Sequence, residues 1–291
     1  MKTKEIENNK IIVKILVLLL ISLITLVLYS RYVGTIGIIV KEYKIESNVI
    51  PSNFSGVKIV HFSDLYFGNT TNENELKKIK SVINELKPDL ILFTGNLFTL
   101  DYNMSEKNKK ILIDFLSELN ASIGKYAVKG SSDFKIDYET ILKESDFILL
   151  NNTYDIIYFN GHEPIFLGGV PSTSKDTLNL NELFKYYKGA EENIQKAKYK
   201  IIISSEGNVF EKIMKYDESV NLLLGSASLG GSVIIPFYGP LFIPKNTTKY
   251  YAPHYKLENK EIFISSGIGT NNIKFRFNNR PSINLYRLKS I

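Results

Sequence analysis

The chain has 291 residues, of which 44% are hydrophobic and 23% are charged, a balance typical of one large globular domain or two small ones. This composition excludes a disordered chain, a collagen and a pure coiled coil. The absence of cysteine excludes a disulfide-stabilised secreted fold, a thiolate zinc site and a cysteine nucleophile. Lys and Arg (36) outnumber Asp and Glu (30), and the net charge of +6 favours anionic surroundings such as a lipid or cell-envelope surface.

An apolar run near the N-terminus predicts a transmembrane helix. Residues 11–30 carry a single charge, at Lys14, and about 20 apolar residues are enough to cross the hydrocarbon core of a bilayer. Bulky residues at positions 29, 31 and 32 follow where a signal peptidase requires small side chains, so we expect an uncleaved anchor. A buried core helix is the alternative, but such a helix rarely lacks a polar face.

Positive charges are distributed unevenly around this run. Only Arg31 follows it closely, whereas several lysines precede it or lie at its start, namely Lys2, Lys4, Lys10 and Lys14. Positively charged flanks tend to stay in the cytoplasm. We therefore expect residues 1–10 to be cytoplasmic, residues 11–30 to span the cell membrane once with the lipid bilayer as their partner, and the large domain to be extracytoplasmic.

Strand-like and helix-like patterns alternate after residue 57. Residues 57–62 form an apolar run, and Asn72 with Glu75 is a helix-capping pair ahead of apolar residues at helical spacing. Further strands are predicted at 90–93, 126–128, 165–168, 199–203, 222–224, 262–265 and 283–288, and further helices at 106–119 and 209–216. This alternation predicts an α/β domain over residues 57–291, preceded by a lead-in strand and linker at 31–56.

Polar and glycine-rich segments follow five of the predicted strands. Ligands bind at the carboxyl ends of strands in α/β folds, so these segments are the candidate site. They are SDLYFG at 63–68, TGNL at 94–97, GSSD at 130–133, SSEGN at 204–208 and SASLGGS at 226–232.

In this order the segments resemble the motifs of the calcineurin-like metallophosphoesterases, in particular the membrane-anchored bacterial branch. The family patterns are SDLHxG, TGDL, GNHD, SHxPD and GHTHGGQ. The stretches 235–244 and 265–270, with Arg276, Phe277 and Pro281, resemble the C-terminal part of that branch. The resemblance implies a four-layer α/β/β/α metallophosphoesterase-like sandwich preceded by one N-terminal transmembrane helix.

The resemblance also implies which residues occupy the family's ligand positions. The family hydrolyses phosphoesters with two divalent metals about 3.5–4 Å apart that activate a water molecule. Asp64 retains the first carboxylate ligand, and Asp133 ends the third motif as a turn carboxylate. The remaining positions are replaced: Tyr66 for a histidine, Asn96 for the bridging aspartate, Ser131 for the asparagine, Ser132 for the histidine that protonates the leaving group, and Ser205, Ala227 and Leu229 for the three later histidines.

The 3 histidines of the chain lie away from these positions. His61 falls within a predicted strand and is interpreted as a core residue. His162 lies in a hairpin-turn sequence and is expected to be exposed. His254 follows Pro253 near the expected mouth of the site and is the histidine that could face it.

The leading hypothesis is a membrane-anchored, catalytically inactive member of the family with a binding or scaffolding role at the cell envelope. No cofactor and no nucleic acid are expected. The alternative is a residual phosphoesterase that acts on an envelope or lipid phosphoester through a single divalent metal ion at Asp64 and Asn96. A third reading is a pocket for an anion or a small phosphorylated ligand, built from the backbone N–H groups of Gly130, Ser131, Gly230 and Gly231 together with the hydroxyls of Ser132, Ser205 and Ser228.

Overall fold

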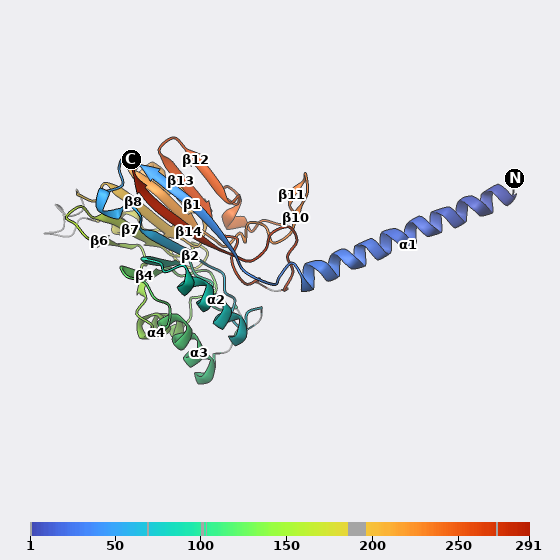
Figure 1. The fold of residues 1–291 in the computed structure, drawn as a ribbon, viewed down its shortest axis with the longest axis horizontal. Helices are drawn as coiled ribbons and strands as arrows, with labels where there is room; N and C mark the ends of the chain where they lie inside the picture. The colour runs from blue at the N-terminus through green and yellow to red at the C-terminus, as the bar shows by residue number, and fades with distance from the viewer. Residues whose placement is uncertain (1, 69, 100–101, 103, 186–195, 272) are drawn as a thin grey trace.

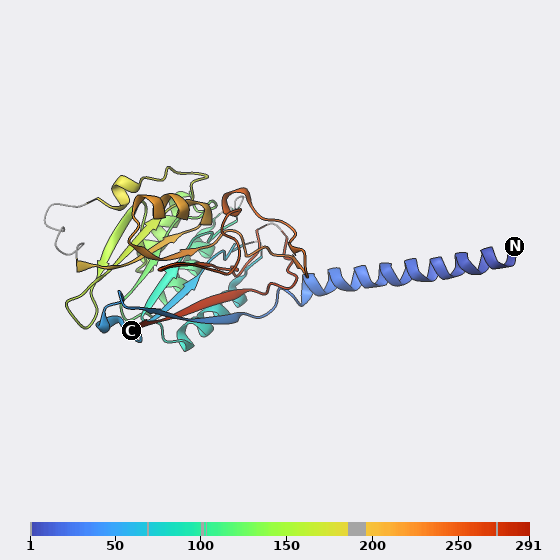
Figure 2. The same cartoon turned by 90° about the horizontal axis from the view of Figure 1, so that it is seen from above.

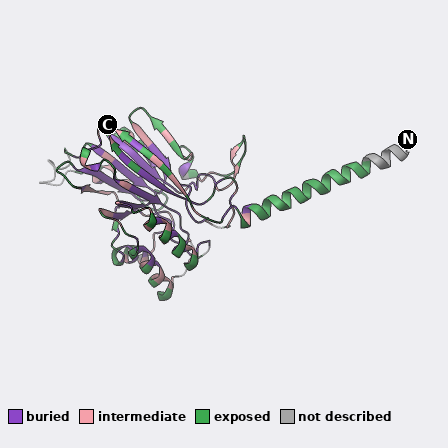
Figure 3. Ribbon diagram, viewed as in Figure 1, coloured by how far each residue is buried: buried purple, intermediate pink, exposed green. Residues whose placement is uncertain are grey.

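The computed structural model describes residues 2–68, 70–99, 102, 104–185, 196–271 and 273–291 (Figure 1). The first helix, α1 (Lys2–Tyr32), extends away from the folded domain in both views (Figures 1 and 2). Its segment Asn9–Tyr32 has 24 residues and is long and apolar enough to cross a membrane. Most of this segment is exposed (Figure 3), and its last turns meet the domain where Tyr29 contacts Phe277.

The first sheet has six strands in the order β1-β14-β2-β3-β4-β5. Strands β2 to β5 are parallel, β14 is antiparallel to β2, and β1 is parallel to β14. The outer face carries the helices α2 (Glu73–Glu85), α3 (Glu106–Ser117) and α4 (Ile136–Glu144). The strands are β1 (Ile39–Ser47), β2 (Lys58–Phe62), β3 (Leu90–Phe93), β4 (Gly124–Ala127), β5 (Ile148–Leu149) and β14 (Ser282–Ser290).

The second sheet also has six strands, in the order β12-β13-β9-β8-β7-β6. Strands β7, β8, β9 and β13 are parallel, and the two edge strands are antiparallel to their neighbours. Helices α5 (Leu180–Leu183) and α7 (Phe210–Tyr216) pack on its outer face. The strands are β6 (Thr153–Ile157), β7 (Ile165–Val170), β8 (Tyr199–Ser204), β9 (Val220–Gly225), β12 (His254–Leu257) and β13 (Lys260–Ile264), and a separate hairpin pairs β10 (Ile234–Ile235) with β11 (Gly239–Pro240).

Three apolar clusters hold the layers together. The central cluster fills the space between the two sheets, with Ile59 and Leu92 from the first sheet against Leu167 and Leu224 from the second. The other two clusters join each sheet to its own helices. This arrangement confirms the expected four-layer α/β/β/α sandwich.

The local sequence explains why α2 begins where it does. The Asn72 side chain accepts a hydrogen bond from the backbone N–H of Glu75 (3.1 Å), and the Glu75 carboxylate accepts one from the backbone N–H of Asn72 (2.9 Å). Such a capping box satisfies helix-terminal N–H groups that would otherwise lack partners. The helix then buries Leu76, Ile79 and Ile83 against the first sheet.

Strand β1 is part of the first sheet, although the sequence pattern placed residues 31–56 outside the domain. All nine residues of β1 pair with β14, from Ile39 with Ser282 to Ser47 with Ser290. Three side chains that precede Val57 are almost fully buried, namely Ile45 in β1 and Ile50 and Phe54 between β1 and β2. The first sheet therefore includes a strand that lies before Val57, and β1 covers the edge of β14.

A truncation tests this boundary. We expect the fragment 33–291 to unfold cooperatively in thermal melts followed by circular dichroism. The fragment 57–291 loses the three buried side chains and exposes the backbone edge of β14, so we expect it to aggregate. A monomeric 57–291 fragment with an equal melting temperature would show that β1 is dispensable.

Candidate functional site

The predicted site residues meet where the strands of both sheets end. Asp64 follows β2, Asn96 follows β3, and Ser132 and Asp133 follow β4, while Ser205 and Ala227 follow strands of the second sheet. Of these residues Ala227 is partly exposed and the others are buried. Ser131, which precedes Ser132, is also partly exposed. Folding therefore brings together side chains that are separated by up to 163 residues, as in the contact between Ala227 and Asp64.

Asp64 is completely buried, and protein groups satisfy both of its carboxylate oxygens. Oδ1 accepts a hydrogen bond from Asn96 Nδ2 (2.8 Å), and Oδ2 accepts one from Ser63 Oγ (2.7 Å) and a longer one from the Ala227 backbone N–H (3.4 Å). Burial raises the pKa of Asp64, while its hydrogen bonds act in the opposite direction. The carboxylate is thus a structural acceptor in a closed environment.

The Asn96 side chain links Asp64 to the loop after β4. Its Nδ2 donates to Asp64, and its Oδ1 accepts from Ser132 Oγ (3.1 Å) and from the Ser132 backbone N–H (3.3 Å). An amide can donate on one side and accept on the other, whereas a carboxylate at this position can only accept. Asn96 therefore serves as a neutral connector between two strand ends.

The Asp133 carboxylate joins the loops after β3 and β4 through hydrogen bonds from their backbone N–H groups. Its carboxylate accepts hydrogen bonds from the backbone N–H groups of Asn96 (2.5 Å), Leu97 (2.8 Å) and Gly130 (2.9 Å). Burial raises the pKa of Asp133 to about 7, although these bonds oppose the rise. These contacts support the interpretation of Asp133 as a turn carboxylate.

Apolar and aromatic side chains fill the remaining space around Asp64. A Cβ atom added to Gly267 would lie 2.6 Å from Leu229 Cδ2 and 2.8 Å from Asp64 Cβ. Gly267 therefore packs closely against both side chains and leaves no room for a larger residue. Tyr66 is also buried, and burial followed by the charges of Asp64 and Asp133 raises its pKa well above the ordinary value. The phenol therefore stays protonated and is a poor metal ligand.

Arg276 belongs to the site, although the sequence pattern gave it no role. The side chain is fully buried, and its two Nη atoms donate to the backbone carbonyls of Ser266 (2.9 Å), Asn279 (3.2 Å), Gly267 (3.1 Å) and Gly269 (2.6 Å). Burial lowers its pKa to about 10, and the charge of Asp64 opposes this change. A charged residue between Phe275 and Phe277 is the one feature of the sequence that could have drawn attention to it.

The residues at the family's ligand positions do not fit a pair of divalent metals. Among the residues that the structure describes, no group of three or more His, Asp or Glu side chains could hold a metal ion. The Asn96 amide directs a donor, not an acceptor, at the carboxylate of Asp64. A cation beside Asp64 would have to displace the hydrogen bonds that already satisfy it.

Most of the backbone N–H groups expected to form an anion pocket already donate hydrogen bonds within the protein. The backbone N–H of Gly130 is bonded to Asp133, that of Gly230 to Ser228 Oγ (3.0 Å), and that of Gly231 to the Ser228 carbonyl (2.9 Å). Ser205 Oγ is buried and, within the described residues, has no hydrogen-bond partner. These N–H groups are already used to shape the loops, so they cannot form the donor set that the sequence suggested.

None of the histidines reaches the site. His61 is buried and contacts Thr94 Oγ1 through Nε2 (2.8 Å), and burial lowers its pKa to about 3, as befits a core residue. His162 is exposed. His254 lies on β12, where Nε2 contacts Glu261 Oε2 (2.8 Å) and the ring stacks on Phe263, so it does not face the site.

A cavity of about 380 Å³ lies beside the site, between the segment after α1 and helix α2. Its lining includes Ile36 and Ile38, the α2 residues Ile79 and Val82, and Ile268. None of the predicted site residues lines it. It is separated from Asp64 by the segment 268–269, whose backbone N–H groups donate to the carbonyls of Ser63 (3.1 Å) and Asp64 (2.7 Å).

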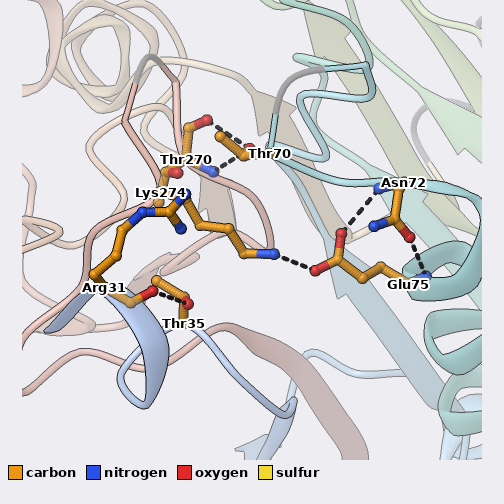
Figure 4. Close-up of polar contacts among 7 residues, drawn as sticks. All are labelled: Arg31, Thr35, Thr70, Asn72, Glu75, Thr270 and Lys274. Carbon is orange, nitrogen blue, oxygen red and sulfur yellow. Dashed lines mark hydrogen bonds and ion pairs between the residues drawn. The ribbon is translucent and has the colours of Figure 1, made fainter. Parts of the chain in front are cut away.

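Polar contacts hold the rim of this cavity (Figure 4). Glu75 caps α2 and also forms an ion pair with Lys274. Thr70 Oγ1 donates to the Thr270 carbonyl (2.7 Å), and Thr35 Oγ1 donates to the Arg31 carbonyl (2.9 Å). The contacts of Thr70 and Glu75 join the start of α2 to Thr270 and Lys274, and the Arg276 N–H, which donates to the Ser30 carbonyl (3.0 Å), links the same region to the end of α1.

Comparisons with known proteins identify the family. A model of the calcineurin-like phosphoesterase family matches residues 57–256. The uncharacterized metallophosphoesterase YkuE of Bacillus subtilis (strain 168) is 31% identical over 265 residues, which cover 90% of this chain and 89% of that protein. An uncharacterized metallophosphoesterase of Aquifex aeolicus (strain VF5) is 27% identical over 256 residues, covering 86% of this chain and 91% of that protein.

A membrane-associated relative is also similar. A transmembrane protein with a metallophosphoesterase domain from Danio rerio is 22% identical over 264 residues, covering 86% of this chain and 57% of that protein. The four-layer fold and the family match agree. The chain belongs to the calcineurin-like phosphoesterase family.

Restoring a carboxylate at position 96 should destabilise the protein. In the variant Asn96→Asp, two buried carboxylates face each other without the amide donor, which should cost about 3 kcal/mol of unfolding free energy at pH 8 in EDTA. The contact raises the pKa of one carboxyl in the folded state above its unfolded value, so the loss should grow as the pH rises from 5 to 8. Urea unfolding of the full-length protein in detergent measures both effects.

The matched control is Asn120→Asp, the same change at an exposed position, which should leave stability nearly unchanged. Equal stability of the two variants at pH 8 would show that the bond between Asn96 and Asp64 contributes little.

Asp133 should make stability depend on pH. Its folded pKa of about 7 lies above the ordinary value of 3.8, so its contribution is fully present below about pH 4 and is lost as the pH rises through 7. The variant Asp133→Asn does not titrate there. Its urea midpoint should therefore fall less between pH 5 and pH 8 than that of the unmodified protein, whereas the exposed control Asp114→Asn should follow the unmodified profile. Parallel profiles for all three proteins would contradict the raised pKa.

Proposed function

We propose that this protein is a membrane-anchored, catalytically inactive member of the calcineurin-like phosphoesterase family with a binding or scaffolding role at the cell envelope. The observation that carries the proposal is the hydrogen bond from Asn96 Nδ2 to Asp64 Oδ1 (2.8 Å). It puts an amide donor against the one carboxylate that remains of the family's ligand set.

Charge balance supports the loss of the reaction. A two-metal site needs anionic ligands that compensate two dications and a water molecule that they activate. Here Asp64 has a single negative charge, Asn96 is neutral, and Leu229 is apolar. Losing even a partner of one ligand typically reduces metal affinity or activity about 10–100-fold, so losing most of the ligands should abolish both.

The form and position of α1 support membrane attachment. The segment Asn9–Tyr32 is apolar and mostly exposed, and a similar protein is named as a transmembrane protein. We propose that residues 11–30 cross the cell membrane once and contact the lipid bilayer. The lysines before the span then keep residues 1–10 in the cytoplasm and place the domain outside it.

The cavity beside α1 supports a binding role. Its walls combine apolar residues from α2 and from the segment after α1 with the charged side chains of Lys78, Lys274, Arg276 and Glu75, of which Lys274 and Glu75 form an ion pair. The lining therefore keeps a net positive charge. This combination suits a ligand that has an apolar part and an anionic group, such as a phosphorylated component of the envelope. The folded site around Asp64 then serves as a rigid support for the loop that forms one wall.

Metal content and turnover test the proposal. The full-length protein, purified in detergent from cells grown with manganese, zinc and iron, should contain no stoichiometric metal by mass spectrometry of the digested sample. It should not hydrolyse bis(p-nitrophenyl) phosphate at any added concentration of these metals.

A reconstructed variant is the matched control. It carries the family's residues at every replaced position: Tyr66→His, Asn96→Asp, Ser131→Asn, Ser132→His, Ser205→His, Ala227→His and Leu229→His. We expect this variant to gain metal binding. Stoichiometric metal in the unmodified protein, with a turnover that Asp64→Ala abolishes, would instead establish the residual phosphoesterase.

A further inference from the structure

One surface of the domain exposes an unusual number of large apolar side chains. They lie on residues 233–242, here called the aromatic hairpin, which contains β10 and β11. The exposed fractions are 38% for Ile235, 111% for Phe237, 78% for Tyr238, 62% for Leu241 and 74% for Phe242. The hairpin carries no charged residue. Contiguous apolar surface of this kind marks a contact with another protein or with a membrane.

The backbone holds these side chains outward. Ile234 pairs with Pro240 and Ile235 with Gly239, and the Leu241 N–H donates to the Val233 carbonyl (2.8 Å). Phe237 occupies the turn with φ +65°, a conformation that Asn or Gly adopts more cheaply. An aromatic residue is thus displayed at the tip of a hydrogen-bonded turn and is not part of a loose loop.

Direct contacts place the hairpin beside the end of α1 (Figure 1). The Ile234 N–H donates to the Phe277 carbonyl (2.9 Å), and the Phe277 N–H donates to the Ser232 carbonyl (3.0 Å). The Phe277 ring meets the ring of Tyr29 edge to face, with centroids 6.2 Å apart. The neighbouring Arg276 N–H donates to the Ser30 carbonyl (3.0 Å).

The end of α1 has the composition of a membrane interface. Tyr29 and Tyr32 lie in its last turns and are 44% and 61% exposed. Tyrosine rings gather where a transmembrane helix leaves the hydrocarbon core. The contact of Phe277 with Tyr29 therefore puts the base of the hairpin near the level at which α1 leaves the bilayer.

We propose that the aromatic hairpin inserts its side chains into the interfacial region of the bilayer that α1 crosses. This second membrane contact rests on the proposed anchoring of α1. Because the hairpin directly follows the loop 226–232, it turns the strand ends and the site around Asp64 toward the lipid surface. The domain then does not swing freely on its anchor.

The absence of tryptophan from the chain permits a direct test. Single tryptophans are placed in the full-length protein by Phe237→Trp in the hairpin, Leu23→Trp in α1, and Ile291→Trp at the exposed C-terminus. The C-terminus lies far from α1 in both views (Figures 1 and 2). Each variant is reconstituted into vesicles made with or without phospholipids that carry bromine on their acyl chains.

The proposal predicts that brominated lipid removes most of the emission at position 237, as it does at position 23, while position 291 keeps its emission. Acrylamide should quench position 291 and spare position 237. Loss of emission at position 23 alone would overturn the hairpin contact and leave the anchor intact, whereas no loss at position 23 would overturn both. A blue shift at position 237 that grows with protein density and is insensitive to bromine would assign the hairpin to a second copy of the chain.

Discussion

The burial of the Asp64 carboxylate is the main electrostatic constraint on this fold, and the hydrogen bond from Asn96 helps to compensate it. A buried carboxylate is costly unless charged or polar groups compensate it. In this structure the amide of Asn96, the hydroxyl of Ser63 and the charge of Arg276 compensate the carboxylate of Asp64. The ends of β2, β3, β4 and β9 meet at this point, so these contacts join loops from both sheets.

The backbone around the site holds three residues other than glycine in the left-handed region. Tyr66, Ala227 and Leu229 all have positive φ angles, of +47°, +63° and +53°. Such conformations cost about 1–3 kcal/mol each for residues other than glycine and persist only where the surroundings enforce them. The hydrogen bonds among Asp64, Asn96 and Asp133 hold the loops in this conformation.

Much of the fold could be predicted because its elements have strong local patterns. Helix α2 has a capping box and a regular apolar face, and β3 is an apolar run of four residues between turns, so both were located closely. The two-residue strand β5 and the short α5 have too little periodicity to be detected. The sheet position of β1 depends on β14, more than 230 residues away in sequence, and no local pattern encodes such a partner.

The site could also be predicted in part. The order of the motifs located Asp64 and Asn96, but the hydrogen bond between them depends on side-chain rotamers, which are defined by packing in the folded protein. The role of Arg276 was missed because its hydrogen-bond partners are backbone carbonyls, which every residue has and which no sequence pattern identifies.

The pairing of β1 with β14 also constrains how the molecule is made. β1 leaves the ribosome more than 230 residues before β14, its neighbour in the sheet. The edge that β1 offers to β14 therefore stays unpaired until β14 has been synthesised. A chain that lacks β14 would carry this open edge, which can pair with other chains.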